Sequence, residues 1–179
     1  MSNSRITYNI IQSPLGELVA GVSPAGCCVC EFHDRGGFDR IRTRVERRHR
    51  MEMAKGDHPL IGSMESQLGD YFGGRRTAFD LELDLKGSPF ELSVWTELLA
   101  IPYGETRAYG RMAKKLGKPG AARAVGKANG SNFLAIIVPC HRVIQEDGSL
   151  RGYGGGLWRK KFLLELEAVS RQEPLAFAV

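Results

Sequence analysis

The chain has 179 residues, 42% hydrophobic and 25% charged, which is the composition of a globular protein with room for one ample domain or two small ones. No apolar run approaches the roughly 18 residues of a membrane span, and residues 1–5 do not open a secretory signal, so we expect a cytoplasmic protein without a membrane partner. The net charge is +5, but residues 86–171 hold 14 Lys and Arg against 7 Asp and Glu, whereas residues 1–85 hold 11 against 12. The second half therefore suits a polyanionic partner, although a solvated basic surface would give the same count.

The first half has the pattern of a small α/β domain. Short β-rich stretches bounded by turns predict strands at 6–11, 18–22 and 27–32. Residues 40–53 are polar and very basic, with no clear apolar face. Residues 58–72 have helical spacing, and residues 77–85 alternate apolar and polar residues like a half-buried strand. We predict an N-terminal α/β domain over residues 1–86.

Three of the four cysteines, Cys27, Cys28 and Cys30, crowd one segment of this half. Disulfides between such close neighbours would be strained, and free thiols are the default in a reducing cytosol. Their spacing is not that of a zinc site, so we expect no metal and no other cofactor.

The second half begins with a helix and continues with two shorter ones. Ser88-Pro89-Phe90-Glu91 is a capping box, and the helix that it starts stops at Pro102. A helix over about 108–116, a glycine-containing turn and a helix over about 121–128 then give the helix-turn-helix pattern. The second helix is small at most positions and cationic at Arg123 and Lys127. This favours nucleic-acid binding over the alternative, a helical hairpin inside an enzyme.

An apolar run over 133–138 predicts a buried strand that delivers Pro139-Cys140-His141-Arg142. A cysteine there is more often inert packing than a nucleophile. However, a neighbouring base and positive potential both favour the reactive thiolate. Because consecutive side chains diverge, by about 180° in a strand and about 100° in a helix, a direct pair of Cys140 and His141 is disfavoured. A water that bridges them is easier to build, and a carboxylate would fix the histidine tautomer.

Downstream, Gly152-Tyr153-Gly154-Gly155-Gly156 would let backbone groups approach a flat ligand closely. A base extruded from a duplex needs such a slot, although the same composition fits a merely mobile loop. A last amphipathic helix from about residue 157 closes a mainly α C-terminal domain over residues 87–171. Residues 172–179 would be a loose tail.

These residues together resemble the O6-alkylguanine-DNA alkyltransferase family, the methylated-DNA–protein-cysteine methyltransferases. The resemblance is carried by Pro-Cys-His-Arg-Val-Ile at 139–144, Ala-Ala-Arg-Ala-Val-Gly at 121–126, and Tyr109. It is strong from about Ser88 to Glu167 and weaker before. It implies a ribonuclease H-like N-terminal domain and a helix-turn-helix in the C-terminal domain.

The resemblance also implies a role for each matching position. Cys140 would accept the alkyl group, with His141 drawing its proton through a water, Glu167 holding His141, and Asn132 bracing the adjacent turn. The base would meet Tyr153, the Gly154 amide, and the carbonyls of Cys140 and Val143. Tyr109 would push the phosphate of the target nucleotide and Arg123 would fill the gap in the base stack. The other DNA contacts would come from the same helix, at Ala122, Ala124 and Lys127.

The implied activity is stoichiometric repair. A monomer would flip O6-alkylguanine, and O4-alkylthymine, out of duplex DNA and keep the alkyl group as a thioether that no residue here can reverse. Relatives often have Asn-Pro where this chain has Asn132-Phe133. The alternatives are a lesion-binding relative that senses damage without transfer, which would lack the acceptor cysteine, and a cysteine hydrolase, which the adjacency of Cys140 and His141 disfavours.

Overall fold

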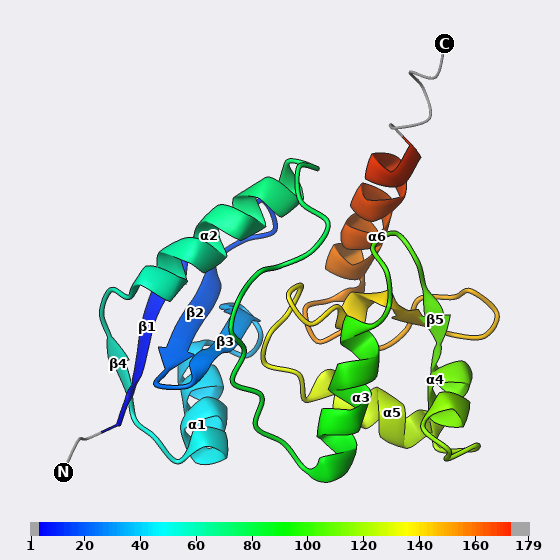
Figure 1. Cartoon of the computed structure of the whole chain (residues 1–179), viewed down its shortest axis with the longest axis horizontal. Helices are drawn as coiled ribbons and strands as arrows, with labels where there is room; N and C mark the ends of the chain where they lie inside the picture. The colour runs from blue at the N-terminus through cyan, green and yellow to red at the C-terminus, as the bar shows by residue number, and fades with distance from the viewer. Residues whose placement is uncertain (1–3, 173–179) are drawn as a thin grey trace. The chain divides into compact units, whose positions relative to one another are not determined.

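The computed structural model describes residues 4–172 (Figure 1), so the predicted tail lies outside the described part except for Gln172. Contacts divide the chain into two compact units. The first is Met1–Gly87 with Phe133–Ile137, and the second is Ser88–Asn132 with Val138–Val179. Within residues 4–172, no helix is both long and apolar enough to cross a membrane.

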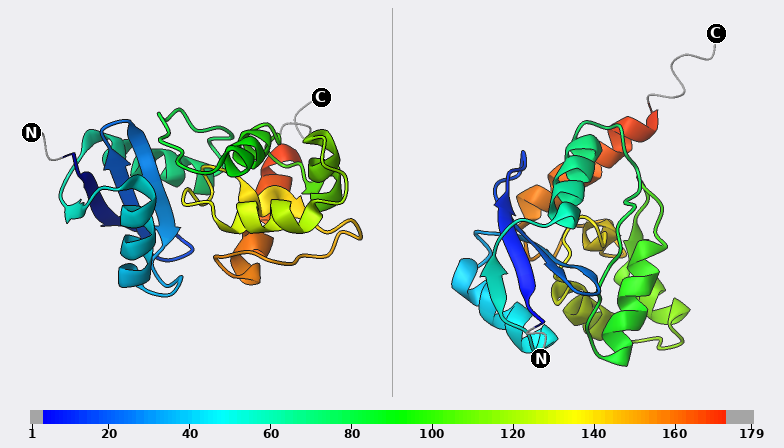
Figure 2. Two further views of the ribbon diagram at one scale, coloured as in Figure 1. Left: turned by 90° about the horizontal axis from the view of Figure 1, so that it is seen from below. Right: turned by 60° about the vertical axis from the view of Figure 1, so that its left-hand side comes forward.

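The first unit is built on a four-stranded sheet in the order β3-β2-β1-β4. β1 (Ile6–Ile11), β2 (Leu18–Ser23) and β3 (Gly26–Phe32) are antiparallel neighbours, and β4 (Met53–Lys55) runs parallel to β1. Every residue of β2 and β3 is buried, which requires cover on both faces of the sheet. α1 (Phe38–His49) and α2 (Pro59–Phe72) provide it from opposite sides (Figure 2).

α1 lies in the basic segment for which the sequence indicated no apolar face. That interpretation was wrong, because one narrow stripe of the helix, Ile41, Val45 and His49, is buried. Ile41 and Val45 join the core cluster of the sheet with Ile6 and Val19. The stripe is hard to see in the sequence because arginines occupy most of the positions between its members.

The two other predicted strands are also wrong, although both segments are extended in part. In residues 77–85 only Leu83 makes a bridge, to Cys27 of β3, and Asp84 turns inward to accept a hydrogen bond from Ser23 Oγ at 2.6 Å. In residues 133–138 the burial is confirmed, but only Leu134 makes a bridge, to Cys30. Ile136 has a φ of 71°, which breaks an extended strand. Phe133–Ile137 also belongs to the first unit, not to the second domain where the sequence had placed it.

The second unit is mainly helical. It contains α3 (Pro89–Leu99), α4 (Tyr109–Lys115), α5 (Ala122–Gly130), α6 (Leu157–Gln172) and the short 3₁₀ helix η1 (Cys140–Arg142). Two short strands, β5 (Arg107–Ala108) and β6 (Val143–Ile144), pair in parallel. The four α-helices lie where the sequence pattern predicts them.

α3 fixes the end of α5 through its own N-terminus and through a tryptophan. The capping box of Ser88 and Glu91 is present, and the second oxygen of Glu91 accepts a hydrogen bond from Ser131 Oγ at 2.7 Å. Trp95, which is buried, donates from Nε1 to the Ala128 carbonyl at 2.9 Å. The C-terminal turn of α5 and the residues just after it are therefore held in place by α3.

The two tryptophans allow a matched test of this packing. We expect Trp95→Ala to lower the free energy of unfolding by about 3–5 kcal/mol, because it removes a large buried side chain and leaves a cavity. Trp158 is 58% exposed, and Trp158→Ala should change the free energy of unfolding by about 0.5 kcal/mol or less. Urea denaturation followed by far-UV circular dichroism measures both, and equal effects would contradict the packing described.

Candidate active site

Cys140 is the first residue of η1 and is 7% exposed. Its Sγ accepts a hydrogen bond from Asn132 Nδ2 at 3.3 Å, and the same amide donates to the Val138 carbonyl at 3.0 Å. Asn129 Nδ2 donates to the carbonyl of Cys140 at 3.0 Å. Two asparagines therefore hold the cysteine: Asn129, in the last turn of α5, at its backbone, and Asn132, two residues after α5, at its sulfur. Asn129 was not among the residues singled out from the sequence.

His141 is fully buried and points away into the protein, where its Nε2 lies 2.7 Å from Glu167 Oε1. Burial lowers the pKa of His141 and outweighs the opposing effect of Glu167, so the imidazole is neutral at neutral pH. Nε2 facing a carboxylate must carry the proton, which leaves Nδ1 as an acceptor. Among the residues that the structure describes, Nδ1 is buried without a hydrogen-bond partner.

Glu167 lies on α6 and is fully buried. Arg142 donates to it from Nε and Nη2, both at 2.9 Å, and the amide of Gly104 donates at 3.1 Å. Burial by itself would raise the pKa of Glu167, but the hydrogen bonds and charges of His141 and Arg142 hold it at about 2. The carboxylate is therefore ionised, and Arg142 neutralises it.

Arg142 has a different position from the one expected. From the sequence, the positive charge of Arg142 was expected to stabilise the thiolate of Cys140. Its guanidinium is instead committed to Glu167 and, through Nη1, to the Ile101 carbonyl at 2.7 Å. Its cation balances the carboxylate.

Lys160 is a residue of this site that sequence reasoning missed. It is fully buried, and its Nζ donates to the carbonyls of Val143 at 2.5 Å and Arg151 at 3.1 Å. Burial lowers its pKa to about 8, against an opposing effect of Cys140. The buried side of α6 has a helical spacing formed by Lys160, Leu163 and Glu167. Two charged residues at such buried positions were the signal in the sequence that could have pointed to this site.

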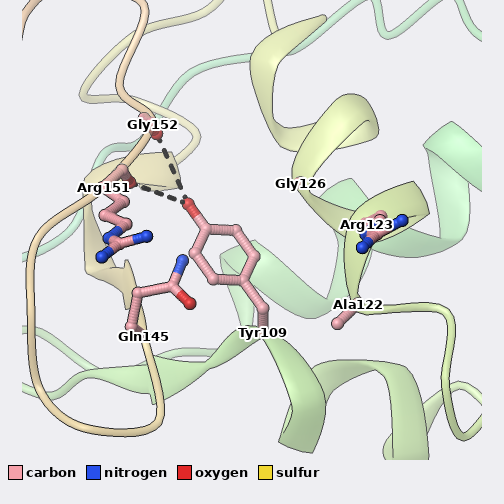
Figure 3. Close-up of a pocket in the computed structure, with 7 residues that line it drawn as sticks. All are labelled: Tyr109, Ala122, Arg123, Gly126, Gln145, Arg151 and Gly152. Atoms are coloured by element: carbon pink, nitrogen blue, oxygen red, sulfur yellow. Dashed lines mark hydrogen bonds between the residues drawn. The ribbon is translucent and has the colours of Figure 1, made fainter.

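A basic pocket of about 290 Å³ lies next to the start of α4 and α5. Three of its residues, Tyr109, Ala122 and Arg123, were predicted from the sequence (Figure 3). The Tyr109 hydroxyl donates to the carbonyls of Arg151 and Gly152, both at 3.4 Å. Burial raises the pKa of Tyr109, offset in part by hydrogen bonding to Asn129. The remaining residues of the lining are Gly126, Gln145, Arg151 and Gly152.

The other predicted residues lie outside this lining. Ala124 and Lys127 are exposed on α5, and Gly154 is exposed in the glycine-rich loop. Tyr153 is partly buried, and the carbonyl of Val143 already accepts from Lys160. Over the described residues, no group of three or more His, Cys, Asp or Glu side chains could hold a metal ion.

The fold and the site define a two-unit protein in which a buried cysteine lies beside a histidine–glutamate pair and in the same unit as a basic pocket. Comparison with known proteins gives the same family at each level. The family described as "6-O-methylguanine DNA methyltransferase, DNA binding domain" matches residues 89–169. The methylated-DNA–protein-cysteine methyltransferase of Mycolicibacterium paratuberculosis is 48% identical over 163 residues, 90% of this chain and 92% of that protein. That of Salmonella typhimurium is 41% identical over 172 residues, 91% of this chain and 96% of that protein.

Among solved structures, Mycobacterium tuberculosis OGT in complex with DNA is similar with a TM-score of 0.78 and 44% identity, over 92% of this chain and 94% of that one. The chain therefore belongs to the methylated-DNA–protein-cysteine methyltransferase family.

Glu167 and Glu165 provide a matched test of the buried carboxylate. We expect Glu167→Gln to lower the free energy of unfolding at pH 7 by about 3–5 kcal/mol, because the Arg142 charge would be left buried without a counter-ion. Glu165 is exposed, and among the described residues it pairs only with Lys161, at 3.7 Å, so Glu165→Gln should cost about 0.5 kcal/mol or less.

The pH dependence of the free energy of unfolding should also differ between the parent protein and Glu167→Gln. The pKa of Glu167 falls from 4.5 to about 2 on folding, so its stabilising contribution is complete above about pH 4.5 and is lost as the pH falls toward 2. Denaturant unfolding curves between pH 2 and 7 test this. An equally steep acid loss in Glu167→Gln would contradict the assignment.

Proposed function

We propose that Cys140 is the residue on which this chain, a methylated-DNA–protein-cysteine methyltransferase by family, accepts the alkyl group of O6-alkylguanine, and of O4-alkylthymine, from duplex DNA. The observation that carries the proposal is the arrangement around Cys140. Asn132 donates a hydrogen bond to its sulfur, and the next residue in the chain, His141, is a neutral imidazole whose free nitrogen is Nδ1. This proton acceptor fits a relay through water better than a direct contact.

The reaction follows from these groups. A water passes the thiol proton of Cys140 to Nδ1 of His141, and the imidazolium that forms is stabilised by Glu167 at 2.7 Å. The thiolate attacks the alkyl carbon, so that a carbon–sulfur bond forms as the carbon–oxygen bond to the base breaks. Tyr153 donates a hydrogen bond to the base as it leaves as an anion, and the proton held by His141 returns through water to neutralise the released base. The thioether is not reversed, and each molecule reacts once.

We also assign the pocket and its helices to DNA binding. α4 and α5 act as a helix-turn-helix, with Ala122, Ala124 and Lys127 against the DNA, Tyr109 at the phosphate of the target nucleotide, and Arg123 in the base stack. The amide of Gly154 and the carbonyls of Cys140 and Val143 meet the base edge. The ribonuclease H-like character of the first unit, a monomeric state, a cytoplasmic location and the independence from cofactors remain predictions.

Mass mapping tests the acceptor. After incubation with duplex DNA that carries O6-methylguanine, we expect the peptide with Cys140 to gain one methylene unit, at one per protein molecule, and Cys140→Ala to gain none. Cys28 is the matched control, because it is buried and its pKa is raised to about 12 by burial, so Cys28→Ala should react like the unmodified protein. Tight binding with Cys140 unchanged would point to a lesion sensor instead.

Arg123 is tested by comparing duplex DNA with the free base. If its guanidinium replaces a stacked base, Arg123→Ala should slow repair in duplex DNA by about tenfold or more and leave the reaction with free O6-methylguanine nearly unchanged. Lys127→Ala, on the next turn of α5, should lower affinity in a salt-dependent way without this contrast. Equal losses on both substrates would rule out the stacking role of Arg123.

A further inference from the structure

The pocket beside Tyr109 has an unusual balance of charge. Of its seven lining residues, two are arginines, Arg123 and Arg151, and none is acidic. Figure 3 shows the two guanidinium groups on opposite sides of the Tyr109 ring, with Gln145 on the side of Arg151. A pocket of this kind fits an anion, and a phosphodiester is the anion that a DNA-binding surface meets.

Tyr109 offers such an anion a neutral donor and no charge. Its hydroxyl lies 3.4 Å from the carbonyls of Arg151 and Gly152 and can turn to a phosphate, but the charge of the phosphate has to be balanced by another group. Lys160 is nearby, at 5.8 Å from the Tyr109 ring centroid, but it is fully buried and its Nζ is bound to two carbonyls. The pocket therefore needs a different cation on this side.

Arg151 meets that need. Its backbone is fixed, because its carbonyl accepts from both Lys160 Nζ and the Tyr109 hydroxyl, while its side chain is exposed and lines the pocket. Within residues 4–172 it forms no salt bridge, and its charge has only a minor effect on the exposed Asp147, whose pKa is lowered mainly by hydrogen bonds from Ser149. A guanidinium on an anchored backbone is well suited to bidentate phosphate binding.

We propose that Arg151 is a phosphate-binding residue of the pocket, which holds the backbone of the strand from which the damaged nucleotide is extruded. The inference rests on the proposed function, and it adds to the DNA-binding residues one that lies outside the motifs at 121–126 and 139–144 that carry the family resemblance. The two arginines then have different roles. Arg123 replaces the lost base stacking, and Arg151 neutralises the displaced phosphate on the other side of Tyr109.

The test is the salt dependence of binding to duplex DNA that carries O6-methylguanine, measured with Cys140→Ala so that no transfer occurs. One lost phosphate contact should reduce the slope of log affinity against log salt by about 1. When the salt concentration is raised fourfold, the affinity of the parent for this DNA should therefore fall about 3- to 4-fold more than the affinity of Arg151→Gln. Arg151→Lys keeps a point charge and should retain most of the slope.

Two controls separate this role from its alternatives. Arg75→Gln removes an equal charge from an exposed ion pair with Asp70 in the first unit and should leave the slope unchanged. With Cys140 present, Arg151→Gln should react with free O6-methylguanine at the parental rate. An unchanged slope, or an equal loss with the free base, would overturn the proposal. Methylation of Cys140 would still be detected in either case, so this outcome is distinct from a failure of the proposed function.

Discussion

The buried carboxylate of Glu167 is the interaction on which the candidate site depends. An ionised carboxylate without exposed surface is very costly unless charge and hydrogen bonds compensate it. Here Arg142 and His141 from η1 and the Gly104 amide from the segment after α3 all meet the carboxylate. Three segments far apart in the chain are thereby fixed at one point, and Cys140 begins the same 3₁₀ turn that provides two of the contacts.

This arrangement bears on how the thiol is activated in the proposed reaction. Because burial, with a smaller effect of Arg142, lowers the pKa of His141, the imidazole is a neutral base and not the permanent imidazolium of a thiolate–imidazolium pair. Asn132, a neutral amide, donates a hydrogen bond to Sγ, and the buried Lys160 interacts electrostatically with Cys140. In the proposed reaction the proton of the thiol therefore leaves through water to His141.

The sequence predicts most of the helices because their signals are local. The capping box of Ser88 and Glu91 and the glycine-containing turn between α4 and α5 act over a few residues. The errors come from long-range effects. The buried stripe of α1 is set by the sheet that it covers, and residues 77–85 and 133–138 lose their strand pairing because Asp84 turns inward to Ser23 and Ile136 takes a positive φ.

The candidate site follows the same division. Cys140 and His141 stand out in the sequence because they are adjacent. Glu167, 26 residues away, enters only through the family resemblance, and by itself it would have been read as a solvated charge. Asn129 and Arg142 gain their positions from backbone carbonyls and charges that only the folded chain brings together, so no local pattern could have assigned them. Lys160, whose Nζ binds the carbonyl of Val143, had only the weak signal of its place on the buried side of α6.

The bond lengths also separate a rigid part of the site from a part that can open. Behind the cysteine, the shortest bonds of His141 and Arg142 to Glu167 and to the Ile101 carbonyl are 2.7–2.9 Å and involve charged groups, which makes them strong. On the pocket side, the bonds that link Tyr109 to the glycine-rich loop are neutral and 3.4 Å long, close to the limit for a hydrogen bond. A ligand that enters the pocket can therefore break the Tyr109 bonds at little cost without disturbing the His141–Glu167 pair. The proposed reaction, which occurs once per molecule, requires these two properties: a fixed proton acceptor behind the thiol, and in front of it a loop that an incoming DNA strand can displace.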